Sequence, residues 1–168
     1  FVVMAMVATA ELGMVGGGQD AFIGSVHRIA ARLDDAYTLV AGALSSTPER
    51  ALRSGRELGL AEDRIYSDFE GMAEREAARD DGIEAVAIVT PNHLHADIAT
   101  AFLSRGIHVI CDKPLAASLA DGRRIADAVA RSGKVFALTH TYSGYPMVRH
   151  ARALVADGML GKIRVARA

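Results

Sequence analysis

The chain has 168 residues, of which 51% are hydrophobic and 23% charged, and its formal net charge is −1. This length and composition predict one folded globular domain of ordinary size and exclude a disordered chain. The near-neutral charge offers no basic field for nucleic acid or an anionic membrane, and five Phe, four Tyr and no Trp leave few surfaces for base stacking. We therefore expect a soluble protein that acts on small molecules, with no nucleic-acid or membrane partner.

The first eleven residues, FVVMAMVATAE, are apolar but do not fit a targeting or membrane segment. They lack the Lys or Arg of a secretory signal, and they are too short to span a bilayer, which takes about 20 residues. An extra edge strand, an appended segment and a wrongly recorded start all stay open, and residues 1–11 receive no function. Cys111 is the only cysteine, which excludes an internal disulfide and fits a reducing compartment such as the cytoplasm.

Beyond this segment, short apolar runs alternate with longer amphipathic stretches. The runs predict six strands, at 12–16, 37–44, 64–66 (the weakest), 84–90, 107–111 and 135–139, and a further strand at 162–168. Helical spacing predicts helices at 22–33, 47–59, 92–105, 118–132 and 145–157 and one after Asp68, with Thr47 and Asp68 as N-caps. This alternation predicts an α/β fold, a doubly wound parallel sheet of the Rossmann type.

Beyond residues 1–11, the pattern divides the chain into two segments. Residues 12–143 are expected to form the nucleotide-binding domain, and residues 144–168 a linking helix and the start of a second, α+β domain. The strand predicted at Lys162 finds no partner in the remaining sequence. We therefore expect the chain to be truncated before that second domain.

A glycine cluster, GGGQDA at 16–21, fits the pattern G-x-G-x-x-[G/A] at the first strand–helix junction. Glycines there let the backbone turn tightly and approach a pyrophosphate, and the following helix directs free amides and the positive end of its dipole at that charge. Gly24 is expected to let helix and strand pack closely. In this context the motif favours a dinucleotide site over a plain flexible loop. The expected cofactor contacts are Gly16, Gly17, Gly18, Gln19, Ala21, Phe22 and Ile23.

The end of the second predicted strand bears on the choice between NAD and NADP. An acidic residue there binds the ribose 2′-hydroxyl of NAD, whereas an Arg accommodates the 2′-phosphate of NADP. Ser45 and Ser46 stand at this point, followed by Arg50, and no acid precedes Glu49. These residues favour NADP over NAD, and the alternative is that Ser46 and Thr47 only cap the helix.

Two further motifs follow the fourth and fifth predicted strands, where open α/β sheets bind their ligands. They are TPNHLH at 90–95 and CDKP at 111–114, and a third motif, GMLGKI, stands at 158–163. The three resemble T-P-N-x-x-H, [E/D]-K-P and G-x-[L/I]-G-[K/E]-[I/V] of the Gfo/Idh/MocA oxidoreductases, the glucose–fructose oxidoreductase and inositol dehydrogenase family. The resemblance covers 12–168, nearly the whole chain.

This resemblance implies an NAD(P)-dependent enzyme that moves a hydride between nicotinamide and a sugar, a polyol or a related hydroxy compound. It implies that Lys113 and His95 are catalytic, with Lys113 reaching the nicotinamide and polarising the substrate hydroxyl. Asp112 stands where the family more often has Glu, and Lys113–Pro114 is a candidate cis bond. His140 follows the sixth predicted strand at the cleft edge. The cofactor contacts expected from these motifs are Thr90, Pro91, Asn92, His95, Asp112, Lys113, Pro114 and His140.

The remaining histidines receive no role in the site. His27 and His150 are expected on helix surfaces, and His93 and His108 are expected to be structural or solvent-facing. No metal site is predicted, because no Cys or carboxylate cluster completes one.

The substrate is left open by the sequence, because the family draws substrate-binding residues and its homo-oligomer interface from a second domain. Two other interpretations also stay open. One is a non-catalytic NAD(P)-binding or regulatory protein. The other is a glycosidase-like enzyme that uses tightly held NAD for a transient oxidation.

Overall fold

The computed structural model describes residues 9–167, and the apolar stretch 1–8 lies outside the described residues. The chain divides into two compact units, the first ending at Leu138 and the second beginning at Thr139. This division falls a few residues before the domain boundary expected at 143, because the last strand of the sheet ends at Leu138. The two units are described separately.

The first unit is built on a five-stranded parallel sheet with the order β2-β1-β3-β4-β5. The strands are β1 (Ala10–Gly16), β2 (Tyr37–Ala43), β3 (Ala85–Val89), β4 (His108–Cys111) and β5 (Phe136–Leu138). The helices are α1 (Phe22–Arg32), α2 (Pro48–Glu57), α3 (Phe69–Ala77), α4 (His95–Leu103) and α5 (Leu119–Ser132). This order, in which β1 lies between β2 and β3, confirms the doubly wound α/β fold.

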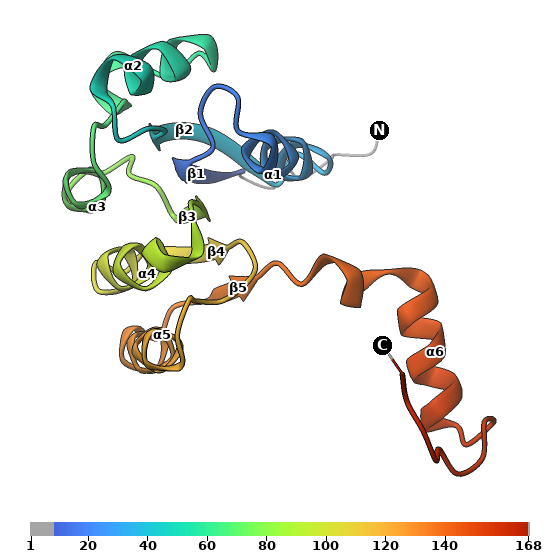
Figure 1. The fold of residues 1–168 in the computed structure, drawn as a ribbon. Coiled ribbons are helices and arrows are strands. Elements are labelled where there is room, and N and C mark those ends of the chain that lie inside the picture. Colours follow the sequence, from blue (N-terminus) through green and yellow to red (C-terminus); the bar gives the residue numbers. More distant parts are fainter. Residues whose placement is uncertain (1–8, 168) are drawn as a thin grey trace, which may run out of the picture. The chain divides into compact units, whose positions relative to one another are not determined.

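Helices cover both faces of the sheet (Figure 1): α3, α4 and α5 follow one another along one face, and α1 packs on the opposite face. Strand β3 is buried along its whole length. Its side chains alternate between two apolar clusters, with Val86 and Ile88 in one and Ala85, Ala87 and Val89 in the other. This period of two is what a parallel strand between two helical layers requires.

Several predicted helix ends are confirmed. The Asp68 carboxylate accepts a hydrogen bond from the Gly71 amide at 2.6 Å and caps α3. Gly133 ends α5 in the left-handed conformation, which glycine adopts without strain. Thr47 is the N-cap residue of α2, as predicted, but its side chain makes no capping bond there. Instead, the Ser45 hydroxyl accepts from the Thr47 amide at 3.1 Å.

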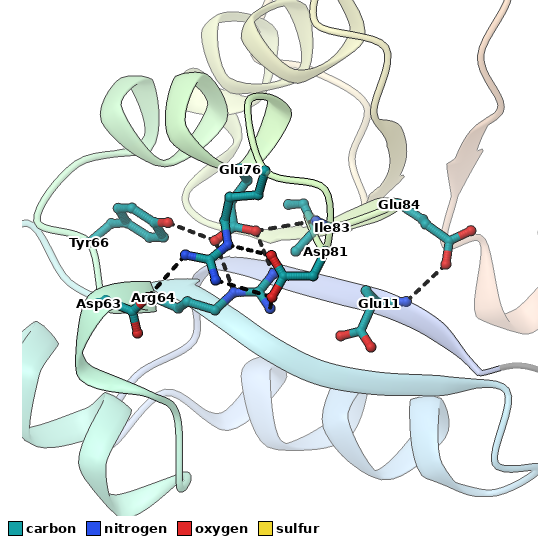
Figure 2. Close-up of polar contacts among 9 residues, drawn as sticks. Glu11, Asp63, Arg64, Tyr66, Glu76, Asp81, Ile83 and Glu84 are labelled. Atoms are coloured by element: carbon teal, nitrogen blue, oxygen red, sulfur yellow. Dashed lines mark hydrogen bonds and ion pairs between the residues drawn. The ribbon is translucent and has the colours of Figure 1, made fainter.

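The strand predicted at 64–66 does not form. Its first residue ends a 3₁₀ turn, η1 (Glu62–Arg64), and Ile65 makes only a single bridge to Gly42 of β2. The flanking side chains turn inward to a carboxylate on α3, as Figure 2 shows. Arg64 is ion-paired with Glu76, and the Tyr66 hydroxyl donates to Glu76 Oε1 at 2.6 Å.

Within the crossover between β2 and β3, this buried cluster ties the end of η1 to α3. The Ile83 amide, just before β3, also donates to Glu76 Oε2, at 3.2 Å. Burial and the hydrogen bond to the Glu76 carboxylate raise the pKa of Tyr66, so its phenol stays protonated as a donor. A buried carboxylate needs such partners, since an unpaired one is strongly destabilising.

The second unit contains the 3₁₀ turn η3 (Thr141–Gly144) and helix α6 (Pro146–Ala156). The helix confirms the one predicted at 145–157. The strand predicted at 162–168 is wrong for its described part, because residues 163–167 have no regular secondary structure. A strand exists only through pairing, and no described strand pairs with this stretch.

Candidate functional site

Four strand–helix connections meet at one edge of the sheet in the first unit. They follow β1, β2, β3 and β4, and because these strands are parallel, their carboxyl ends lie at the same edge. The connection after β3 contains a second 3₁₀ turn, η2 (Asn92–Leu94). The point between β1 and β3, where the chain direction of the crossovers reverses, is the place where open α/β sheets form their ligand cleft.

A cavity of about 730 Å³ lies at this point. It brings together most of the predicted cofactor contacts from the first three connections, namely Gly16, Gly17, Gly18, Gln19, Ala21, Ser45, Ser46, Arg50, Thr90 and Pro91. Residues that the sequence patterns did not indicate complete its lining, among them Ser54, Ser67, Asp68, Phe69, Glu70, Leu94 and Ile98. Ser54 was accessible to sequence reasoning, since it lies one helical turn after Arg50 on α2.

The glycine loop has the close backbone packing that the motif predicts. Gly16 and Gly17 have φ angles of +80° and +71°, in a region that residues other than glycine rarely adopt. A Cβ at Gly24 would lie 2.5 Å from the Gly17 carbonyl oxygen, so helix α1 and the loop touch backbone to backbone. The predicted packing role of Gly24 is therefore confirmed.

Two side chains that sequence reasoning missed hold this loop. The Arg28 guanidinium donates to the Gly17 carbonyl oxygen at 2.6 Å, and the Gln19 amide donates to Ser54 Oγ at 3.0 Å. Burial and the neighbouring Arg32 lower the pKa of Arg28 from that of a free guanidinium. Arg28 lies one turn after Gly24, on the helix face that meets the loop, and this spacing is a signal for its role.

The connection after β3 contributes a polar atom and a buried ring. Thr90 Oγ1 is buried and, among the described residues, has no hydrogen-bond partner, although Thr90 lines the cavity. His95 begins α4 and is only 1% exposed. Its Nε2 lies 2.9 Å from the Thr90 carbonyl oxygen and its Nδ1 3.0 Å from the Pro114 carbonyl oxygen, so the ring faces the protein interior.

The connection after β4 contains the predicted cis bond between Lys113 and Pro114, which is confirmed. Both residues are exposed on this turn and do not line the 730 Å³ cavity. The expectation that His27 lies on the helix surface is wrong: its side chain is 10% exposed, and its Nε2 is 3.5 Å from Asp112 Oδ1. The acidic residue of the motif is thus linked to α1.

Three further predicted site residues of the first unit, Phe22, Ile23 and Asn92, do not line the cavity. Phe22 is 81% exposed at the first position of α1, and Ile23 packs against the apolar cluster beneath that helix. Asn92 is half-buried in η2. His140 belongs to the second unit, where it is exposed at the start of η3.

The cavity has features that a dinucleotide site requires. Helix α1 directs the amides of its first turn, which lack acceptors within the helix, toward the glycine loop. No side chain caps this end, because Ala21 stands at the N-cap in an extended conformation. The glycines at 16–18 leave room for a ligand close to the backbone, and the helix terminus and the Thr90 hydroxyl have unused hydrogen-bonding capacity. Together these features match an anionic, hydroxyl-rich ligand.

A family model described as "Oxidoreductase family, NAD-binding Rossmann fold" matches residues 10–140. This match covers more than half of the chain. The chain belongs to the Gfo/Idh/MocA oxidoreductase family. The motifs at 16–21, 90–95 and 111–114 all lie inside the matched region.

Several curated and solved relatives agree with this assignment. An uncharacterized oxidoreductase, YfiI, of Bacillus subtilis is 42% identical over 90% of this chain and 39% of its own length. The levoglucosan dehydrogenase of Pseudarthrobacter phenanthrenivorans is 32% identical over 91% of this chain and 38% of its own length.

Among solved structures, an oxidoreductase from Sinorhizobium meliloti is 62% identical, with a TM-score of 0.88 over 94% of this chain and 44% of its own. An inositol dehydrogenase homolog from Azotobacter vinelandii, crystallised with NAD⁺, is 40% identical, with a TM-score of 0.90 over 94% of this chain and 41% of its own. The chain thus spans about two fifths of the length of the relatives it matches.

Residues 9–167 offer neither a metal site nor a membrane-spanning helix. They contain no group of three or more His, Cys, Asp or Glu side chains arranged to hold a metal ion. None of the helices in this range is long and apolar enough to cross a membrane.

Cys111, the last residue of β4, gives a prediction on reactivity. Its thiol is buried, and desolvation, with a smaller effect of Asp112, raises its pKa to about 12. Because the thiolate is the nucleophile, we expect no labelling by iodoacetamide at pH 8 in the folded protein and full labelling in denaturant. Mass spectrometry of both samples checks this, and rapid labelling of the folded protein would contradict the burial of Cys111.

Proposed function

We propose that this chain is the cofactor-binding half of an NAD(P)-dependent dehydrogenase whose substrate is a sugar, a polyol or a related hydroxy compound. The observation that carries the proposal is the cavity between β1 and β3, where the glycine loop, the free end of α1 and the Thr90 hydroxyl converge. The names of the relatives support the substrate class, since one is a levoglucosan dehydrogenase and another was crystallised with NADH and myo-inositol.

In this proposal Lys113 is the catalytic residue that meets the substrate. When bound, the nicotinamide ring accepts or supplies the hydride. The Lys113 ammonium is exposed on the turn after β4. It would donate a hydrogen bond to the reacting oxygen of the substrate and so stabilise the charge that develops there. His27 would steady this turn through Asp112, the neighbour of Lys113.

We further propose that NADP(H) is preferred over NAD(H). Ser45, Ser46 and Arg50 line the cavity beside the end of β2, where the ribose 2′ position is bound in this fold. Two hydroxyls and a guanidinium suit a phosphate. The acids Asp68 and Glu70 also line the cavity, but the Asp68 carboxylate already accepts from the Gly71 amide and the Ser67 hydroxyl.

Replacing Arg50 tests this preference. Arg50→Ala is expected to weaken NADPH binding by about tenfold, the loss of one exposed charge-assisted phosphate contact, and to leave NADH binding within about twofold. Titration with each cofactor, followed by calorimetry, checks it. Arg53→Ala is the matched control, because Arg53 is exposed on the same helix and does not line the cavity. An equal loss of NADH affinity would remove Arg50 from the 2′-phosphate site.

The single buried cysteine suits a reducing compartment, and we propose a cytoplasmic enzyme on this ground. We also propose that the complete enzyme is a homo-oligomer. Analytical ultracentrifugation of that enzyme would show a multiple of the chain mass, and a monomer at micromolar concentration would contradict this.

A further inference from the structure

We propose that His95 is a positioning residue that fixes the nicotinamide side of the cofactor site, rather than a group that exchanges protons with substrate. This inference rests on the proposed function, because it divides the site into two halves. One half is the glycine loop and the start of α1. The other half consists of the turns after β3 and β4, which contain Thr90 and the Lys113–Pro114 bond.

Burial and contacts exclude direct contact between the His95 ring and a ligand in the cavity. The residue is 1% exposed and does not line the cavity. Its two ring nitrogens lie within 3.0 Å of two carbonyl oxygens, those of Thr90 and Pro114. Both ring nitrogens face carbonyl oxygens inside the protein, so neither is directed at a ligand in the cavity.

The two contacts join the connection after β3 to the connection after β4. Thr90 is the first residue after β3, and Pro114 lies in the turn after β4, nineteen residues along the chain from His95. Carbonyl oxygens only accept, so each contact needs an N–H from the ring: the neutral ring carries one and the protonated ring two. The ring is therefore a rigid spacer that sets how far the Thr90 backbone lies from the turn that presents Lys113.

The glycine loop is held by a different set of contacts. Arg28 fixes the Gly17 carbonyl, Ser54 fixes the Gln19 amide, and Leu44 accepts from the Gly18 amide at 3.2 Å. None of these contacts involves His95. A change at His95 should thus disturb the nicotinamide half of the site and leave the half that binds ADP-ribose intact.

The test compares ligands with and without nicotinamide on the full 168-residue chain. NADH is paired with ADP-ribose, and NADPH with 2′-phospho-ADP-ribose, in calorimetric titrations of the unchanged chain, His95→Gln and His95→Phe. Gln can donate to one of the two carbonyls, and Phe keeps a ring of similar size but donates to neither. His93→Gln is the control, because His93 is exposed two residues earlier in η2.

We expect His95→Phe to lower the affinity for the tighter-binding nicotinamide cofactor by about tenfold or more, and His95→Gln to lower it less. The affinity for the matching ligand without nicotinamide should stay within about twofold. Should the Phe variant fail to show a folded circular dichroism spectrum, the Gln variant decides. Equal losses for both members of a pair, or no loss for either, overturn the positioning role. Binding of neither pair by the unchanged chain overturns the proposed function itself.

Discussion

Ala21→Asp is expected to weaken cofactor binding by about a hundredfold while making the folded chain more stable. Ala21 is the N-cap residue of α1, has extended backbone angles, and lines the cavity beside the glycine loop. An aspartate there would accept from the first-turn amides and interact favourably with the helix dipole, which adds roughly 1 kcal/mol to the free energy of unfolding. The same carboxylate would face a pyrophosphate and repel it.

The opposite signs of these two effects make the result specific. Ala21→Asn is the matched control, because asparagine caps the helix as well but is uncharged. Thermal unfolding and cofactor titration of both variants check the prediction. If Ala21→Asp bound cofactor as well as Ala21→Asn, the start of α1 would not be the pyrophosphate site.

A substitution in the glycine loop would be less informative. A Cβ at Gly18 would lie 2.6 Å from the Leu44 carbonyl oxygen and 2.9 Å from Ser54 Oγ. Valine at this position would collide with the protein before any ligand entered. Loss of binding in Gly18→Val would thus combine a distorted loop with a blocked site.

Lys113→Ala is expected to lower the turnover of the complete enzyme by about 10²- to 10⁴-fold, the range that a positioned proton-transfer group contributes. Cofactor affinity should change only several-fold, because the lysine does not line the cavity that we propose as the dinucleotide site. Steady-state rates with a polyol or sugar substrate and a separate cofactor titration distinguish the two effects.

The control for this variant is Lys134→Ala. Lys134 lies between α5 and β5, where its amide donates to Ser132 Oγ, and it precedes the strand instead of following it. It therefore belongs to the amino edge of the sheet, opposite the site. Unchanged turnover in Lys113→Ala would remove this lysine from the mechanism, and an equal loss in Lys134→Ala would show that the effect is not specific to the turn after β4.

Much of the fold was accessible from local sequence signals. The run EAVAIVT predicted a strand buried on both faces, and β3 is such a strand. Gly24 was predicted to let the first helix and strand pack closely, and in the structure it packs against the backbone of Gly17, directly after β1. These features depend on residues close together in the sequence, where periodicity and glycine content carry the information.

The predictions that were wrong concern features that depend on contacts between residues far apart in the sequence. Residues 64–66 read as a strand because Ile65 and Tyr66 are typical strand residues, but Glu76 on α3 draws Arg64 and Tyr66 inward and prevents pairing beyond one bridge. His95 read as catalytic from its motif, and its two carbonyl partners come from separate turns that only the folded chain brings together. No local pattern specifies either contact.

We expect this chain to bind a nicotinamide dinucleotide in the cavity between β1 and β3. The most direct test is calorimetric titration of the chain with NADPH and with NADH. Saturable binding with one ligand per chain, tighter for NADPH and lost in Ala21→Asp but not in Ala21→Asn, is the predicted result. Absence of binding for both cofactors in a chain with a folded circular dichroism spectrum, or binding that Ala21→Asp leaves unchanged, would contradict it.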